Sequence, residues 1–192
     1  MKPFTFRCAL ITLTLIAPGL VWADDKKPNP ADLDRQAAQP AAIHKEMAKL
    51  AGDYTTVTKL RLSPDTEPTE TTGAAKLTVI LDGRFLQDEN TVSMFGQSYK
   101  GLRLYGYNNG SKQFEATWFY TGSTGTMRLI GSSKDEGKTV DWTASYDDAN
   151  GKQTMQVITK IVDADHFVVE MIAKLPDGKK GPSFETTYTR RK

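Results

Sequence analysis

The sequence predicts an all-β protein: a closed antiparallel up-and-down barrel of about ten strands, preceded by one short helix. Three observations predict this fold. Turn residues recur at regular intervals, apolar and polar residues alternate between the turns, and a single amphipathic stretch precedes the first strand. A chain of 192 residues, 39% hydrophobic and 25% charged, is long enough for one folded domain with its own core.

Residues 1–23 have the pattern of a cleavable signal peptide. Lys2 and Arg7 precede an apolar run that begins at Cys8, and small residues stand before a cut after Ala23. The run is shorter than the roughly 20 residues that a transmembrane helix needs. We therefore expect a periplasmic or secreted protein with no transmembrane span after cleavage. Cys8 is the single cysteine of the chain, so the mature protein would have no disulfide or thiolate chemistry.

Residues 24–40 mix charges, proline and alanine without an apolar period, which predicts a flexible leader. Residues 41–192 then form the single barrel domain. Its first element is predicted to be a short amphipathic helix with start and stop signals in place. These signals are Pro40 in the first turn, Ile43, Met47 and Leu50 on one face, and Gly52 just past the end.

Nine turn signals divide the rest of the chain into ten segments. They centre near residues 66, 82, 96, 109, 122, 136, 149, 164 and 178, so successive centres lie 13 to 16 residues apart. These intervals leave no room for the crossover of a dozen residues that a parallel pair requires, so neighbouring strands are antiparallel. An open sheet of ten strands would expose two long edges, and closure into a barrel removes them.

Alternation between the turns gives each strand one apolar face. Two strands show it clearly: Phe114, Ala116, Trp118 and Tyr120, and Val140, Trp142, Ala144 and Tyr146. A period of two with one apolar face predicts that this face lines the inside of the barrel. Ten strands enclose a wider lumen than the eight that already leave room for side chains or one small ligand.

The charge pattern argues against two classes of partner. Lys and Arg number 25 against 23 Asp and Glu, and Lys2 and Arg7 in the signal peptide account for the excess, so the mature chain is neutral and nucleic acid is not expected. A membrane-spanning barrel needs one uncharged face on each strand. The third strand has none, because Glu89 points to one face and Asp88 to the other.

Residues with catalytic or metal-binding chemistry are few. His44 is expected on the solvated side of the helix, and His166 is expected to point outward at the rim. The sequence contains none of the common nucleophile, zinc or phosphate motifs. The segment 148–151 is interpreted as a hairpin turn, since an EF-hand would need acidic residues where Tyr146 and Val157 stand.

Three methionines, Met127, Met155 and Met171, are expected to face inward as adaptable core residues rather than as copper ligands. No metal and no cofactor are predicted.

The most informative polar feature lies on the third and fourth strands, over residues 84–93 and 97–107. A hairpin centred on Gly96 would pair Glu89 with Arg103, Gln87 with Tyr105 and Phe85 with Tyr107 on one face. If that face is inside, the row is a polar patch in an apolar lumen, as in ligand pockets. If it is outside, the row is a solvated salt bridge worth less than about 1 kcal/mol. A slip of one residue would reverse the assignment.

Several short motifs, in this order and spacing, resemble the bacterial family named domain of unknown function 1579. They are Ala51-Gly52-Asp53-Tyr54, Asp82-Gly83-Arg84-Phe85-Leu86, Gly101 leading to Gly106-Tyr107-Asn108, Thr117-Trp118 leading to Ser123-Thr124-Gly125, and Tyr188-Thr189-Arg190. The resemblance covers about residues 42–191. Tyr120 stands where the family pattern has an acidic residue. The resemblance implies a calycin-like or lipocalin-like barrel, exported in many members, with no established activity.

Three functions are compatible with these features. The first is binding of a small, largely apolar molecule in the lumen, lined by aromatic residues, with an arginine fixing a polar end. The second is an interaction or envelope-associated module with a packed barrel. The third is an enzyme with Glu89 as the base and Tyr105 or Arg103 as the electrophilic partner. The residues expected to line a ligand site are Trp118, Tyr120, Trp142, Tyr146, Arg84, Glu89, Arg103 and Tyr105. The sequence does not indicate an oligomeric state.

Overall fold

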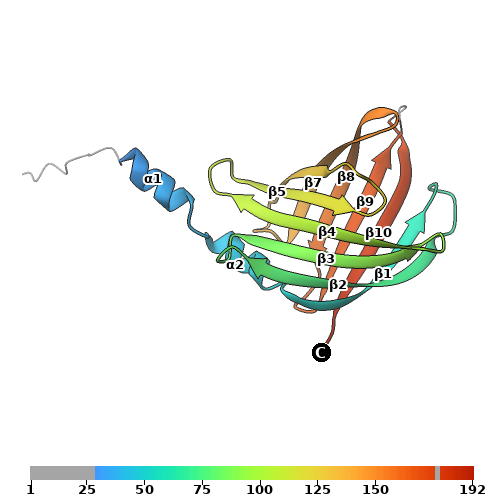
Figure 1. Ribbon diagram of the computed structural model, residues 1–192, viewed down its shortest axis with the longest axis horizontal. Helices are drawn as coiled ribbons and strands as arrows, with labels where there is room; N and C mark the ends of the chain where they lie inside the picture. Colours follow the sequence, from blue (N-terminus) through green and yellow to red (C-terminus); the bar gives the residue numbers. More distant parts are fainter. Residues whose placement is uncertain (1–28, 176–177) are drawn as a thin grey trace, which may run out of the picture.

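The computed structural model describes residues 29–175 and 178–192, and it is a closed barrel of ten antiparallel strands (Figure 1). The strands are β1 (Gly52–Arg61), β2 (Thr69–Ile80), β3 (Phe85–Met94), β4 (Gln97–Asn108), β5 (Gln113–Tyr120), β6 (Met127–Ser132), β7 (Thr139–Asp148), β8 (Gly151–Ile161), β9 (His166–Lys174) and β10 (Lys180–Arg190). Each strand pairs with its neighbour in the chain, and β1 closes the barrel against β10. The predicted fold is confirmed.

Two helices precede the barrel. Helix α2 (Ala42–Ala48) is the predicted helix, although it begins two residues after Pro40. Helix α1 (Pro30–Ala37) lies within the segment predicted to be a flexible leader, where Asn29 caps its first turn, and none of its residues is buried. Figure 1 shows α1 pointing away from the barrel. The predicted signal peptide lies outside the described residues.

The alternation of each strand builds the core as expected. Seventeen buried apolar residues from nine strands form one cluster inside the barrel. Within it Phe167 and Tyr188 stack at 4.1 Å, and Tyr54 meets both rings edge-on. Because inward-facing residues of neighbouring strands lie side by side, aromatic rings from β1, β9 and β10 pack against one another toward the end of the barrel that α2 covers.

Helix α2 closes one end of the barrel and is fastened there by hydrogen bonds. The Tyr54 hydroxyl donates to the Leu50 carbonyl at 2.8 Å, and the Arg190 guanidinium donates to the carbonyls of Lys49 and Ala51 at 2.8 and 2.5 Å. These bonds satisfy carbonyls at the helix C-terminus that have no partner within the helix. The described residues of the turns at the opposite end form no helix. We call the two ends the helix end and the open end.

The turn between β6 and β7 comes close to α2 at Gly137. This glycine has a φ of 89°, and a β-carbon there would lie 2.8 Å from the side chain of Ile43. Glycine therefore allows both the backbone conformation and the close contact that seats the helix.

Candidate functional site

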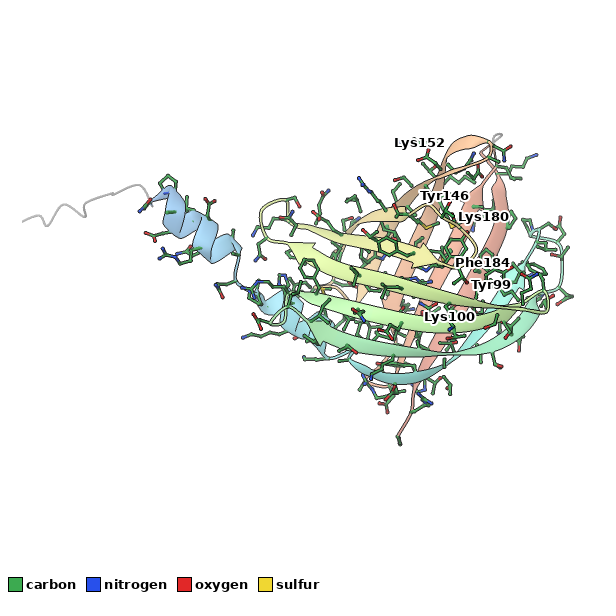
Figure 2. All side chains as sticks on the ribbon, in the orientation of Figure 1. Tyr99, Lys100, Tyr146, Lys152, Lys180 and Phe184 are labelled. Atoms are coloured by element: carbon green, nitrogen blue, oxygen red, sulfur yellow. The ribbon has the colours of Figure 1, made fainter. Side chains whose placement is uncertain are left out.

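Two cavities lie inside the barrel, one at each end. The open-end cavity has a volume of about 400 Å³, and the cavity beneath α2 about 110 Å³. The larger one is lined by aromatic residues, threonines and methionines, among them Tyr99, Trp118, Tyr120, Tyr146, Phe184, Thr58, Thr186, Met127, Met155 and Met171. Figure 2 labels Tyr99, Tyr146 and Phe184 on β4, β7 and β10, three of the strands around the open end.

The smaller cavity is lined mainly by apolar residues, although Glu46, Asp88, Glu136, Lys138 and Thr159 also lie on its lining. Ile43, Met47 and Leu50 of the helix end cover it, and the barrel contributes Leu77, Leu86, Phe114, Val140, Trp142, Ile161 and Phe167. Trp142 donates its indole hydrogen to Thr159 at 3.1 Å, so this polar atom is satisfied. The smaller cavity thus belongs to the hydrophobic core under the helix.

A buried polar cluster separates the two cavities. Asp88 on β3 lines the smaller cavity, whereas Arg103 on β4 and Tyr188 on β10 line the larger one. Arg103 Nη1 donates to Tyr188 Oη at 2.9 Å and to Asp88 Oδ2 at 3.4 Å, and Tyr188 Oη lies 3.3 Å from the same carboxylate oxygen. Asn90 Nδ2 donates to Asp88 Oδ1 at 3.3 Å. The cluster forms the floor of the open-end cavity.

Burial dominates the electrostatics of this floor. It raises the pKa of Asp88 above its usual value, and Arg103 and the hydrogen bonds from Asn90 and Tyr188 oppose that effect only in part. It also raises the pKa values of Tyr188 and Tyr105, so both phenols stay neutral. Burial alone would lower the pKa of Arg103, but the interactions with Tyr188, Tyr105 and Asp88 raise it by more than burial lowers it. The guanidinium therefore stays charged.

Aromatic rings surround the exposed side of Arg103. Its guanidinium lies 4.5 Å from the centre of the Trp118 ring, and Trp118 stacks on Tyr120 at 4.9 Å. Trp118 Nε1 is buried without a hydrogen-bond partner. A β-carbon at Gly101 would lie 2.9 Å from this nitrogen, so the absence of a side chain there leaves room beside the ring.

Six of the eight predicted site residues line the two cavities. Arg103, Trp118, Tyr120 and Tyr146 line the open-end cavity, and Tyr105 and Trp142 line the smaller one. The sequence therefore predicted residues of both cavities but did not indicate that the lumen is divided into two.

Arg84 and Glu89 line neither cavity. Arg84 donates to the carbonyls of Ala38 and Leu81 outside the helix end, at 3.0 and 3.3 Å. Glu89 faces outward, where Gln87 donates to it at 2.6 Å. Both residues were predicted to face a ligand in the lumen, and for both that prediction is wrong.

The error at Glu89 is a shift in register of one residue. In the structure Asp88 opposes Arg103, Leu86 opposes Tyr105 and Phe85 opposes Gly106. The hairpin turns at Phe95 and Gly96, both with positive φ (53° and 73°), so its centre lies between them rather than on Gly96. The predicted pairs Glu89–Arg103, Gln87–Tyr105 and Phe85–Tyr107 are therefore wrong, and Asp88 takes the place of Glu89.

Both histidines lie at the helix end. His44 is buried, accepts a hydrogen bond from the Ala41 amide at 3.0 Å and meets Tyr107 edge-on, so the prediction of a solvated side chain is wrong. His166 stands at the rim, as predicted, with Nδ1 2.8 Å from the Asp163 carboxylate. Among the described residues no three His, Cys, Asp or Glu side chains gather as metal ligands do.

Sequence reasoning missed Asp88, Asn90, Tyr188 and Phe184 as members of the site. Tyr188 and Asp88 are 100 residues apart in the chain and meet only because the barrel closes. The inward orientation of Met127, Met155 and Met171 is confirmed. A two-residue hairpin turn at Phe95 and Gly96 would have placed Asp88 opposite Arg103. The sequence thus held a signal for Asp88 in the length of that turn.

The family described as protein of unknown function (DUF1579) matches residues 39–190. This chain belongs to the DUF1579 family. The match covers both helix α2 and all ten strands, so the whole barrel is the family's domain. No curated protein is significantly similar in sequence.

The solved structures that resemble this DUF1579 barrel include the following two. Rv2717c from M. tuberculosis is 11% identical, with a TM-score of 0.58 over 80% of this chain and 100% of its own. The S-type phycobiliprotein lyase CPES from Guillardia theta is 10% identical, with a TM-score of 0.56 over 86% of this chain and 99% of its own. At these identities the likeness shows a common fold. No helix among the described residues is long and apolar enough to cross a membrane.

Proposed function

We propose that this protein is an exported barrel that binds a small, largely apolar molecule in the open-end cavity. The observation that carries this proposal is the cavity itself: about 400 Å³, lined by aromatic, methionine and threonine side chains, with a buried polar cluster at its floor. Ligand pockets have this volume and composition. Export rests on the signal peptide pattern of residues 1–23.

The smaller cavity favours the same assignment by contrast. It holds about 110 Å³, is capped by α2 and lies within the core. The larger one opens at the end without a helix, where a ligand can enter without unfolding a fastened element. An enzyme that uses Glu89 as its base is disfavoured, because Glu89 faces the outside of β3.

Native mass spectrometry of the mature protein, purified from the exported fraction, tests the proposal. A co-purifying compound at one copy per chain, identified after organic extraction, would support it. If the mass is that of the polypeptide alone, a panel of apolar dyes and lipids is titrated into the same sample. Absence of binding and of thermal protection by every compound would refute the proposal.

A matched pair of variants tests whether the ligand binds in the open-end cavity. Thr186 lines the open-end cavity, whereas its neighbour Thr187 does not. Thr186→Trp fills the cavity and is expected to lower the affinity of any bound compound at least tenfold. Thr187→Trp is expected to leave that affinity unchanged. Circular dichroism and the midpoint of thermal unfolding show whether both variants are folded.

A further inference from the structure

The charges around the open-end cavity are unevenly distributed. Of the described residues that line it, Arg103 at the floor is a cation whose side chain points inward, whereas Lys100 lies three residues away on β4, where its exposed side chain points to the outside of the barrel. Arg103 donates through Nη1 to Tyr188 and Asp88, and its guanidinium is the charged donor at the floor. A guanidinium donates hydrogen bonds and accepts none. This end of the cavity therefore suits a ligand group that accepts hydrogen bonds and is negatively charged.

The carboxylate of this polar cluster, that of Asp88, lies on the side of the cluster that faces the smaller cavity. Asp88 is 1% exposed and lies on the far side of Arg103, lining the cavity beneath the helix. Its carboxylate is 3.4 Å from Arg103 Nη1, and the pair as a whole is neutral when Asp88 is ionised. An anionic ligand against Arg103 would then leave one net negative charge in a buried site, which is unfavourable.

A single proton resolves this conflict. We propose that the open-end cavity takes an apolar carboxylic acid with its carboxylate against Arg103, and that Asp88 takes up one proton as the acid binds. The ligand brings one negative charge and the solvent supplies one proton to a carboxylate oxygen of Asp88, so the net charge of the floor does not change. This inference rests on the proposed function and names the ligand class for the same cavity.

The groups around Asp88 leave it as the site of that proton. Arg103 faces it from β4 and Tyr188 from β10, Asn90 is its neighbour on β3, and Tyr105 of β4 interacts with it electrostatically. Arginine stays protonated at all relevant pH values. Burial raises the pKa of both phenols, so neither loses a proton near neutrality. Burial likewise raises the pKa of Asp88, in the direction that proton uptake requires.

Three naphthalene compounds of similar size provide the test: 2-naphthoate, 2-acetylnaphthalene and 2-isopropylnaphthalene. Their affinities for the mature protein are measured by tryptophan fluorescence and calorimetry from about pH 6 to about pH 9, where a naphthoate carboxyl is ionised. We expect naphthoate to bind tightest at the low end of this range. Its affinity should fall with rising pH by up to about tenfold per unit, as binding linked to one proton requires. The two uncharged compounds should show no pH dependence.

Two neighbouring residues on β3 supply the variant and its control. Asp88→Asn removes the titrating carboxyl and should make naphthoate binding independent of pH. It should also raise the affinity at about pH 9 at least fivefold above that of the wild type. Glu89→Gln removes the outward-facing carboxyl one residue away and should leave the wild-type pH dependence intact. Persistence of that dependence in folded Asp88→Asn would overturn the inference.

Proton uptake can also be measured without a variant, in case Asp88→Asn does not fold. Calorimetry of naphthoate binding to the wild type, in two buffers with different ionisation enthalpies, should show uptake of about one proton per ligand. No uptake, or naphthoate binding weaker than that of acetylnaphthalene at every pH, contradicts the inference while the proposed function stands. If none of the three compounds binds, both this inference and the proposed function fail for ligands of this size.

Discussion

The two ends of the barrel are built from the same ten strands but differ in how their interiors are used. At the helix end, α2 is fastened by Tyr54 and Arg190, and the residual cavity is about 110 Å³. At the open end none of the described helices covers the strands, and about 400 Å³ remain unfilled. The difference teaches that the tightly packed core and the larger open volume are separated along the barrel axis, with the Asp88–Arg103–Tyr188 cluster between them.

Replacement of one tryptophan at each end should give the largest contrast. Trp142 is buried beneath the helix and packs against Phe114 and Tyr105, so Trp142→Ala should lower the free energy of unfolding by about 3–5 kcal/mol. Trp118 is only half-buried beside the open cavity, so Trp118→Ala should cost about half as much and should weaken ligand binding instead. Chemical denaturation measures both costs. Equal costs would show that the two ends are packed alike.

Removal of one helix-end hydrogen bond should have a smaller effect of the same kind. Tyr54→Phe leaves the Leu50 carbonyl without its donor, which should lower the free energy of unfolding by about 1–2 kcal/mol. Ligand affinity at the open end should not change, because Tyr54 does not line that cavity. A loss of affinity in this variant would mean that the two ends are coupled through the core.

The pH dependence of stability should have opposite signs at the central cluster and at the helix end. The pKa of Asp88 is raised by burial, so its contribution is most favourable below its usual value of 3.8 and is lost as pH rises through the higher folded value. Hydrogen bonds from the Asp165 amide and the His166 ring lower the pKa of Asp163, so its contribution is present above 3.8 and is lost in acid.

Denaturation of the wild type, Asp88→Asn and Asp163→Asn over a pH series measures these two trends. The wild type should lose stability relative to Asp88→Asn as pH rises above about 3.8. It should lose stability relative to Asp163→Asn as pH falls below about 3.8. Trends of the same sign for both variants would contradict the electrostatic account of the cluster.

Much of this architecture could be predicted because it depends on local patterns. Turn spacing fixed the number of strands, and alternation placed Trp118, Tyr120 and Tyr146 inside, since both depend on residues close in sequence. The register of β3 and β4 could not be derived in the same way. Phe95 adopts a positive φ that bulky residues rarely adopt, so the turn was centred on the glycine alone. That one-residue shift exchanged Asp88 for Glu89.

Other parts of the site depend on contacts between distant segments. Tyr188 reaches Asp88 because β10 pairs with β1 around the closed barrel, and alternation within a strand carries no information on which residues meet across the lumen. His44 looked solvated because the apolar stripe of the helix is narrow, yet it is buried against Tyr107 of β4. Division of the lumen into two cavities follows from side-chain packing, which strand patterns do not specify.

The methionine side chains allow the most direct test of the central claim, that a ligand binds at the open end. Met127, Met155 and Met171 line the open-end cavity, whereas Met47 lines the cavity beneath α2. We would label the methionine methyl groups with carbon-13 and record their spectra during titration with 2-acetylnaphthalene. The account predicts that the signals of Met127, Met155 and Met171 shift together and that the signal of Met47 does not. A shift of Met47 alone, or of none of the four, would contradict it.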